Sequence, residues 1–180
     1  MTVFIDFEKK TSPPIILINL FNFLNNMTTF DLNMNIKKGL WKDVTALGGT
    51  FFFFIVLAFL ISLEYTTVFF QLLLGFLFSG VVITLARLIY FKPRPKPTEY
   101  TNFIERIDAS SFPSWHAARI VFLSLTLHTF FQNRFISLIL TIITLLVCYS
   151  RIRLQKHDWI DIGAGVLLGV LTYWLTIKFI

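Results

Sequence analysis

The chain has 180 residues, of which 56% are hydrophobic, and a formal net charge of +6. Soluble domains are usually about 45–50% apolar even when glycine is counted, so this composition indicates a membrane protein, and the length suits one domain. The basic residues cluster at the ends of apolar segments, which favours lipid head groups and phosphate as partners over nucleic acid. Cys148 is the only cysteine, which excludes an intrachain disulfide.

Residues 1–49 are expected to form an N-terminal segment at the membrane surface. The start of the chain shows neither a basic cluster nor a small-residue cleavage site, so no cleaved signal peptide is expected. The apolar stretch 14–24 is too short to cross about 30 Å of hydrocarbon, and it predicts an amphipathic interfacial helix. Residues 25–49 are mostly polar, with a second short interfacial helix expected over 40–47.

Residues 50–180 are expected to form one all-α domain, a polytopic bundle of about five transmembrane helices. Five apolar runs predict these spans, over residues 50–65, 67–90, 114–131, 135–150 and 158–180. The connections 64–67 and 132–134 are tight, so the helices they join should be antiparallel neighbours. A long, proline-rich loop covers residues 92–113, and long ordered loops in compact domains are usually functional. Gly165 and Gly169 permit close approach of another helix to the last span.

The ends of these spans bring three polar segments to one face of the membrane. The second span ends just before Arg94, and the third begins at Ser114. The fourth ends just before Arg151, and the fifth begins just after His157. Because successive spans alternate in direction, all four ends are expected on the same side.

Arg87 and Arg94 lie at the exit of the second span. A guanidinium group binds phosphate oxygens bidentately. Pro95 and Pro97 stop the helix and extend the chain, which can turn Arg94 towards the other two segments. The alternative for either arginine is that it extends to the lipid head groups, as arginines at helix ends do.

The segment Pro-Ser-Trp-His at residues 113–116 opens the third span. Free backbone N–H groups at a helix N-terminus bind anions, and the Ser114 hydroxyl can add a donor. The alternative is that Ser114 only caps the helix and His116 lies in the interface. Arg119, one turn later, fits either a supporting role or a side chain that reaches to the interface. His128 lies about 18 Å along the helix from His116 and is expected near the opposite interface, outside the site.

Arg151 and His157 flank the connection between the last two spans. Asp161 lies four residues after His157, so its carboxylate can face the imidazole ring on a helix. An Asp–His pair fixes which ring nitrogen carries hydrogen and strengthens the other as a base or nucleophile. The alternative is a plain interfacial hydrogen bond. Asp158 would point away from His157 and fits a helix cap.

In order and spacing, these three segments resemble the three-part signature of the type 2 phosphatidic acid phosphatase (PAP2) superfamily. That family includes membrane lipid phosphatases and, more distantly, vanadium haloperoxidases. The motifs cover residues 87–161, and residues 43–48 look like a segment often found before the first core span. The chain departs from the family pattern in two ways: Arg87 stands where the family usually has lysine, and an interfacial helix replaces a full first span.

The resemblance implies a role for each of these residues. His157 would be the nucleophile, Asp161 would orient it, and His116 would protonate the leaving oxygen and later activate water. The phosphate-binding residues are expected to be Arg87, Arg94, Ser114, Trp115 and Arg151. No cofactor and no metal are expected, because the sequence has no carboxylate or thiolate cluster of suitable spacing.

The resemblance therefore implies a metal-independent, integral membrane phosphatase that acts on a lipid phosphate through a phosphohistidine. A polyprenyl pyrophosphate is the expected substrate, and phosphatidylglycerophosphate, phosphatidic acid and lipid A are alternatives. A non-catalytic lipid-binding or transport protein on the same scaffold is disfavoured because His116, His157 and Asp161 are all present. A haloperoxidase is disfavoured by the five spans, since those relatives are soluble.

The expected location is the plasma membrane, with the active site on the extracytoplasmic side. The positive-inside rule would place the Lys- and Arg-rich face in the cytoplasm. Those charges are expected to bind phosphate, however, and the resemblance favours the outer face. The sequence leaves the oligomeric state open.

Overall fold

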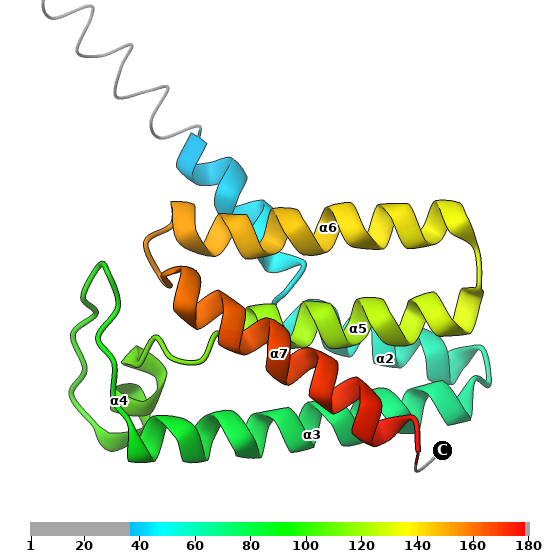
Figure 1. Cartoon of the computed structure of the whole chain (residues 1–180), viewed down its shortest axis with the longest axis horizontal. Coiled ribbons are helices and arrows are strands. Elements are labelled where there is room, and N and C mark those ends of the chain that lie inside the picture. Colours follow the sequence, from blue (N-terminus) through cyan, green and yellow to red (C-terminus); the bar gives the residue numbers. More distant parts are fainter. Residues whose placement is uncertain (1–36, 179–180) are drawn as a thin grey trace, which may run out of the picture. The chain divides into compact units, whose positions relative to one another are not determined.

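The computed structural model describes residues 37–178, and all regular structure in that range is helical (Figure 1). The helix expected over residues 14–24 lies outside the described residues. Residues 37–46 are helical, and a turn at 47–49 follows. The helices after this turn are α2 (Thr50–Ser62), α3 (Thr66–Ile89), α4 (Phe103–Ala109), α5 (Trp115–Phe131), α6 (Arg134–Arg153) and α7 (Trp159–Thr176). The all-α class and the five long helices expected after residue 50 are confirmed.

Four helical stretches within residues 37–178 are long and apolar enough to cross a membrane. They are Lys37–Ser62, α3, α6 and α7. Their outer faces expose large apolar side chains, such as Phe51, Leu138 and Leu167, as expected for helices that face lipid. The protein is therefore an integral membrane protein. Of the five expected spans, the one over residues 114–131 corresponds to α5, which has 17 residues and is not among these four, and the first expected span is part of the longer stretch Lys37–Ser62.

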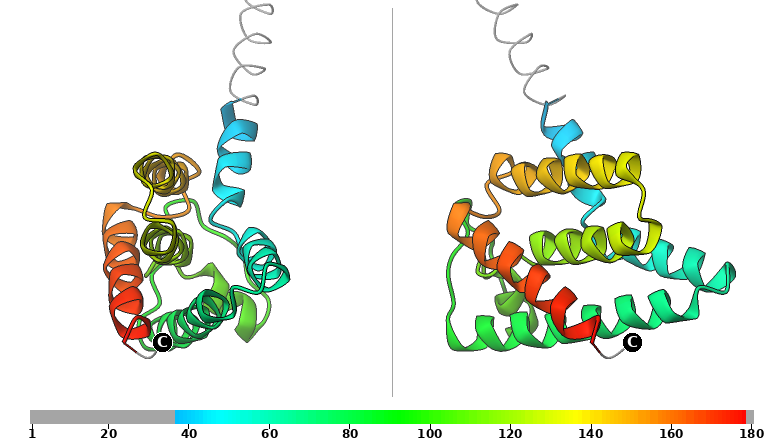
Figure 2. Two further views of the ribbon diagram at one scale, coloured as in Figure 1. Left: turned by 90° about the vertical axis from the view of Figure 1, so that its right-hand side faces the viewer. Right: turned by 45° about the vertical axis from the view of Figure 1, so that its right-hand side comes forward.

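Helix α5 is the central helix of the unit that begins at Gly39. It lies against α7, α6 and α3, and these helices surround it in the end-on view (Figure 2). Its residues 117–123 are all buried, and Phe122 packs with Phe53, Leu72 and Val147 in the main apolar core. Because α5 is surrounded, both ends of this helix are positioned by packing as well as by the loops.

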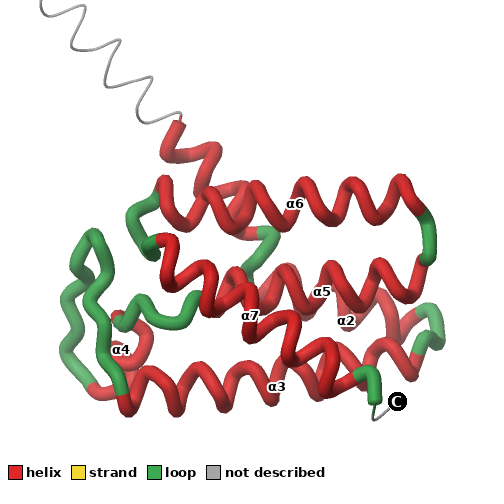
Figure 3. Tube along the Cα trace, in the orientation of Figure 1, coloured by secondary structure: helices red, strands yellow, loops and turns green. Residues whose placement is uncertain are grey.

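The loops gather at two opposite ends of the bundle. The turns after α2 and α5 lie at one end, while the loop 90–102, α4 and the 154–158 connection lie at the other (Figure 3). This second end is where the three polar segments are found. The alternating directions expected for the spans are therefore present.

Two segments outside the expected spans differ from the expectation. Helix α4 lies within the 92–113 segment, which was expected to have no helix. Two side chains cap its N-terminus. Asn102 Oδ1 accepts a hydrogen bond from the Glu105 N–H at 2.8 Å, and Glu105 Oε2 accepts one from the Thr101 N–H at 2.7 Å. The 39–49 stretch, expected at the surface, packs against the bundle: Val44 and Leu47 join the core cluster, and Trp41 packs edge-on against Tyr149.

Helices α5 and α7 touch backbone to backbone at two glycines, as expected from their spacing. A Cβ atom at Gly165 would lie 2.5 Å from the Ser114 carbonyl oxygen, and one at Gly169 would lie 2.6 Å from the Ala118 carbonyl oxygen. No side chain fits in these gaps, so the glycines set how closely α7 can approach α5.

We expect Gly169→Ala to destabilise the protein, because the added methyl group would overlap the backbone of α5. The loss should be roughly 1–3 kcal/mol, which is typical of overpacking. Gly163→Ala in the same helix is the matched control, since a Cβ atom there meets nothing within 4 Å. Thermal unfolding of both variants in detergent measures the difference. Equal midpoints for the two variants would contradict the close contact.

Candidate active site

The three polar segments meet at the loop-rich end of the bundle. Arg87 at the end of α3 donates to the Pro113 carbonyl oxygen, just before α5. His157, just before α7, donates to the Ser111 carbonyl oxygen and lies beside Arg151 at the end of α6. Residues more than 60 positions apart in the sequence thus form one cluster, and most of it is buried.

Arg87 is held by backbone carbonyl groups of the loop that precedes α5. Its two terminal nitrogens donate to the Ile107 and Pro113 carbonyl oxygens, each at 3.2 Å. The side chain is only 6% exposed, so it does not extend to the head groups. This arginine ties α3 to the start of α5.

Arg94 turns back towards the cluster, as its neighbouring prolines predict. A terminal nitrogen donates to the Asp108 carbonyl oxygen and lies 3.6 Å from the Asp108 carboxylate. Its side chain is 9% exposed, whereas that of Asp108 is 79% exposed. Arg94 is therefore also directed into the protein and not towards lipid.

Arg151 lies in the last turn of α6 and contacts both His157 and the 39–49 stretch. One terminal nitrogen donates to Thr45 Oγ1 at 3.1 Å, and the other lies 3.4 Å from His157 Nε2. Thr45 was not among the expected site residues. It lies within residues 43–48, a stretch noted only for its family resemblance, and its distant partner explains why it was missed.

The hydrogen-bond partners of His157 define its tautomer. Nδ1 lies 2.7 Å from the Ser111 carbonyl oxygen, which can only accept, so Nδ1 carries the hydrogen. Nε2 faces the guanidinium group of Arg151, which can only donate, so Nε2 keeps its lone pair. Burial lowers the pKa of His157 below its usual range and Arg151 lowers it further, while the Asp161 carboxylate and the Ser111 carbonyl oxygen oppose the shift. The lowered pKa and these two contacts favour a ring that is neutral at pH 7, with the lone pair on Nε2.

Asp161 is fully buried and lies 3.8 Å from His157 Nδ1. Its Oδ2 accepts from the Asp158 N–H at 3.0 Å, and its Oδ1 accepts from Lys92 Nζ at 2.8 Å. The Nδ1 hydrogen is thus donated directly to the Ser111 carbonyl oxygen, and Asp161 lies beyond hydrogen-bond distance. Asp158 caps α7 as expected, because its Oδ1 accepts from the Asp161 N–H at 2.9 Å.

Ser114 and His116 lie at the first turn of α5. Ser114 is fully buried, and its hydroxyl oxygen accepts from the Ala117 N–H at 3.5 Å, so it is the helix cap. The Ser114 N–H donates to the Asp161 carbonyl oxygen at 3.0 Å, which joins α5 to α7. His116 is half-buried, and its main chain lies close to Gly48.

The ring of Trp115 packs against α3. It lies 6.0 Å from the Phe76 ring between centroids, and a Cβ atom at Gly80 would be 3.3 Å from it. The indole Nε1 is buried and has no partner among the described residues. Contact with phosphate through this nitrogen stays a prediction.

Arg119 supports the bundle from within. It is 3% exposed, donates to Thr50 Oγ1, and its guanidinium carbon lies 5.1 Å from the centroid of the Trp115 ring. This burial decides between the two alternatives, since the side chain does not reach the interface.

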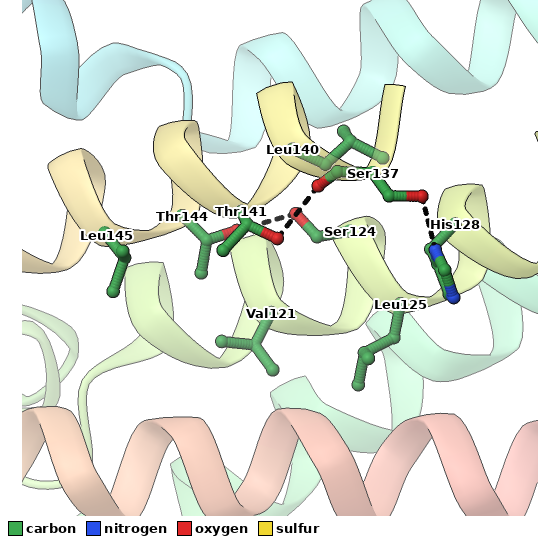
Figure 4. Close-up of a pocket in the computed structure, with 9 residues that line it drawn as sticks. All are labelled: Val121, Ser124, Leu125, His128, Ser137, Leu140, Thr141, Thr144 and Leu145. Atoms are coloured by element: carbon green, nitrogen blue, oxygen red, sulfur yellow. Dashed lines mark hydrogen bonds between the residues drawn. The ribbon is translucent and has the colours of Figure 1, made fainter. Parts of the chain in front are cut away.

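His128 lies away from the cluster, as expected. Its Nδ1 is 2.6 Å from the hydroxyl of Ser137, in a groove between α5 and α6 that also contains a hydrogen bond between Ser124 and Thr144 (Figure 4). This groove is near the end of the bundle opposite to His157. Within residues 37–178, no group of three or more His, Cys, Asp or Glu residues is placed to hold a metal ion.

Comparisons with known proteins agree with this arrangement of helices. The family model described as the PAP2 superfamily matches residues 68–180. Undecaprenyl-diphosphatase BcrC of Bacillus subtilis (strain 168) is 34% identical over 104 residues, which cover 56% of this chain and 52% of that protein. The chain thus spans about half the length of this curated relative.

Two solved structures share the fold. LpxE of Aquifex aeolicus superposes with a TM-score of 0.67 at 23% identity, covering 79% of this chain and 86% of that one. A PAP2-type phosphatidylglycerolphosphate phosphatase from Bacillus subtilis gives a TM-score of 0.64 at 20% identity, covering 79% and 75%.

We expect the ring of His157 to be neutral at pH 7, with hydrogen on Nδ1, and to become protonated only below the usual histidine range. The reason is its burial between a carbonyl acceptor and a guanidinium donor. Nitrogen-15 NMR of histidine-labelled protein measures this, with the His157→Ala spectrum as the assignment control. An imidazolium signal at pH 7, or hydrogen on Nε2, would contradict the geometry.

Proposed function

This chain belongs to the PAP2 superfamily, and we propose that it is a membrane phosphatase that removes phosphate from a lipid. The observation that best supports the proposal is the position of His157 Nε2, which lies 3.4 Å from the guanidinium group of Arg151. A nucleophile beside a phosphate-binding cation is what phosphoryl transfer to a protein side chain requires. We assign the activity to residues 50–180, with Thr45 supporting Arg151.

The proposed reaction has two displacements at phosphorus. His157 Nε2 attacks the terminal phosphorus, the bond from that phosphorus to the leaving oxygen breaks, and His116 gives that oxygen a proton. The leaving oxygen is the bridging oxygen of a pyrophosphate, which departs with the lipid monophosphate, or the lipid oxygen of a phosphomonoester. Water then attacks the phosphohistidine, His116 takes a proton from the water, and the phosphorus–nitrogen bond breaks to release inorganic phosphate.

The proposed phosphate ligands are Arg151, Arg87, Arg94, the Ser114 end of α5 and Trp115. Arginine forks and a helix N-terminus stabilise the extra negative charge of a five-coordinate phosphorus. Arg87 and Arg94 donate to carbonyl oxygens in this structure. On phosphate binding, each would either donate to a phosphate oxygen in place of the carbonyl oxygen, or keep the carbonyl partner and stabilise the phosphate by its charge alone. Because arginines supply this charge, we propose that the reaction needs no metal.

For the substrate we propose a polyprenyl pyrophosphate. The support is the similarity to a protein named undecaprenyl-diphosphatase. Phosphatidylglycerophosphate, phosphatidic acid and lipid A are the alternatives to compare in one assay of phosphate release by the detergent-purified protein. We further propose that the protein lies in the plasma membrane with the site at its extracytoplasmic face, where the phosphates of recycled carrier lipids would be reached.

We expect His157→Ala to lower turnover by at least about a thousandfold without unfolding the protein, because the nucleophile is lost. His128→Ala is the matched control and should keep most of the activity, since this histidine bonds to Ser137 far from the cluster. Phosphate release and thermal unfolding are measured for both. Near-normal turnover by a folded His157→Ala protein would refute the proposed mechanism.

A second expectation concerns metal and inhibitor. Activity should persist in excess EDTA, and vanadate should inhibit, since its five-coordinate form resembles the transition state. Arg151→Ala should weaken vanadate inhibition together with turnover. Arg151→Lys should restore only part of both, because an ammonium group lacks the planar fork. Activity that EDTA abolishes and Mg²⁺ restores would instead indicate a metal-dependent phosphatase.

A further inference from the structure

Lys92 joins the first turn of α7 to the loop that carries Arg94. Its Nζ lies 2.5 Å from Asp158 Oδ2 and 2.8 Å from Asp161 Oδ1. Burial opposes the charge of this side chain, but the hydrogen bonds to the two carboxylates outweigh it and raise the pKa of Lys92. The side chain is therefore a stable cation between two carboxylates.

The main chain of Lys92 is held as firmly as its side chain. Its carbonyl oxygen accepts from the Ser111 N–H at 2.8 Å and from the Ser111 hydroxyl at 3.2 Å. Its own N–H donates to the Ser110 hydroxyl at 3.3 Å. Both serines are fully buried. One residue thus contacts the loop before α5 through its backbone and α7 through its ammonium group.

The residues that Lys92 contacts are also the residues that face Nδ1 of His157. The Ser111 carbonyl oxygen accepts the Nδ1 hydrogen at 2.7 Å, and Asp161 Oδ2 lies 3.8 Å from Nδ1. Both residues that face Nδ1 are therefore bonded to Lys92: Ser111 through its N–H and hydroxyl, and Asp161 through its other carboxylate oxygen. The other charged or titratable groups near the ring are Arg151 on α6 and His116 on α5.

The charges explain why the cation matters. Asp158 and Asp161 each give one oxygen to the cap of α7 and the other to Lys92. Without Lys92, the buried Asp161 carboxylate would keep, within the described part of the chain, only the charge of Arg87, which is not bonded to it, and His157 is the adjacent group that could gain a positive charge. The imidazolium form would then be favoured, and the lone pair of Nε2 would be lost to a proton.

We infer that Lys92 is a positioning residue: by binding Ser111 and the two carboxylates, it keeps His157 neutral with its Nε2 lone pair available. The inference rests on the proposed function, in which His157 is the nucleophile. It goes beyond that proposal because no motif residue of the sequence analysis supplies this cation.

The test compares Lys92→Met and Lys92→Arg with Lys96→Met. Lys96 is exposed in the same loop, and its N–H bonds to the Gln155 carbonyl oxygen, a contact that its substitution retains. We expect Lys92→Met to lower kcat at pH 7 roughly 10- to 100-fold, as loss of a residue that orients a functional histidine does. The activity should be recovered at higher pH, because the acidic limb of the pH–activity profile shifts to higher pH when the pKa of His157 rises. In Lys92→Arg the acidic limb should return to its wild-type pH, and in Lys96→Met it should stay at that pH.

A loss of kcat that is equal at every pH would overturn the inference, since it would indicate structural damage alone. So would an unchanged profile in Lys92→Met. If that variant does not fold, Lys92→Gln with Asp158→Asn removes one charge of each sign, and the same upward shift is expected because Asp161 loses its cation.

NMR titration of the His157 ring separates this inference from the proposed function, because it needs no substrate. A ring that titrates at higher pH in Lys92→Met supports the inference even if the wild-type protein releases no phosphate. A titration that is the same in both proteins overturns the inference, whatever the activity of the wild type.

Discussion

The hydrogen bond from the Ser114 N–H to the Asp161 carbonyl oxygen joins the first turns of α5 and α7. It can form only because Gly165 lets the two backbones meet, since a Cβ atom there would overlap the Ser114 carbonyl group. On either side of this bond lie His116 and His157, the proposed acid and nucleophile. The close contact of two helices therefore sets the distance between two groups that would act on the same phosphorus.

Burial of cations is the second constraint. Arg87, Arg119 and Arg151 are each at most 7% exposed, yet none of the three forms an ion pair within residues 37–178. Carbonyl oxygens, threonine hydroxyls and an imidazole nitrogen accept their hydrogen bonds instead. No carboxylate bonds directly to these three groups, and the buried Nε of each arginine has no hydrogen-bond partner among the described residues. An anion such as phosphate would gain from their positive charge on entering the cluster.

The helices were predicted well from the sequence, because apolar runs separated by polar connections are typical of membrane spans. The sequence also predicted which segments meet. When spans alternate in direction, the end of one span and the start of the next lie on the same side of the membrane. The sequence did not predict Lys92, Ser111 or Thr45, whose partners lie 66, 46 and 106 positions away. Only the folded chain shows such pairs. Helix α4 could have been found, because Asn102 followed by Glu105 three residues later is a capping pattern.

The relation of Asp161 to His157 shows where a spacing rule reaches its limit. Residues four apart face each other within a helix, but α7 begins at Trp159, so His157 precedes the helix. The carboxylate is also already hydrogen-bonded, since Asp161 Oδ2 accepts from the Asp158 N–H in the helix cap. Nδ1 consequently takes its direct partner from another segment, the Ser111 carbonyl group.

The position of Arg119 has a consequence for how the chain enters the bilayer. Arg119 lies just over one turn into α5. An arginine in a lone helix opposes insertion, by about 2.5–3.5 kcal/mol at the helix centre and by less near its ends. In the bundle, the guanidinium group is enclosed by Thr50 of α2, Phe76 of α3 and its own neighbour Trp115. Both α2 and α3 precede α5 along the chain and leave the ribosome first. The partners that shield this charge are therefore synthesised before the charge itself, so α5 can enter a membrane in which its binding surface is already present.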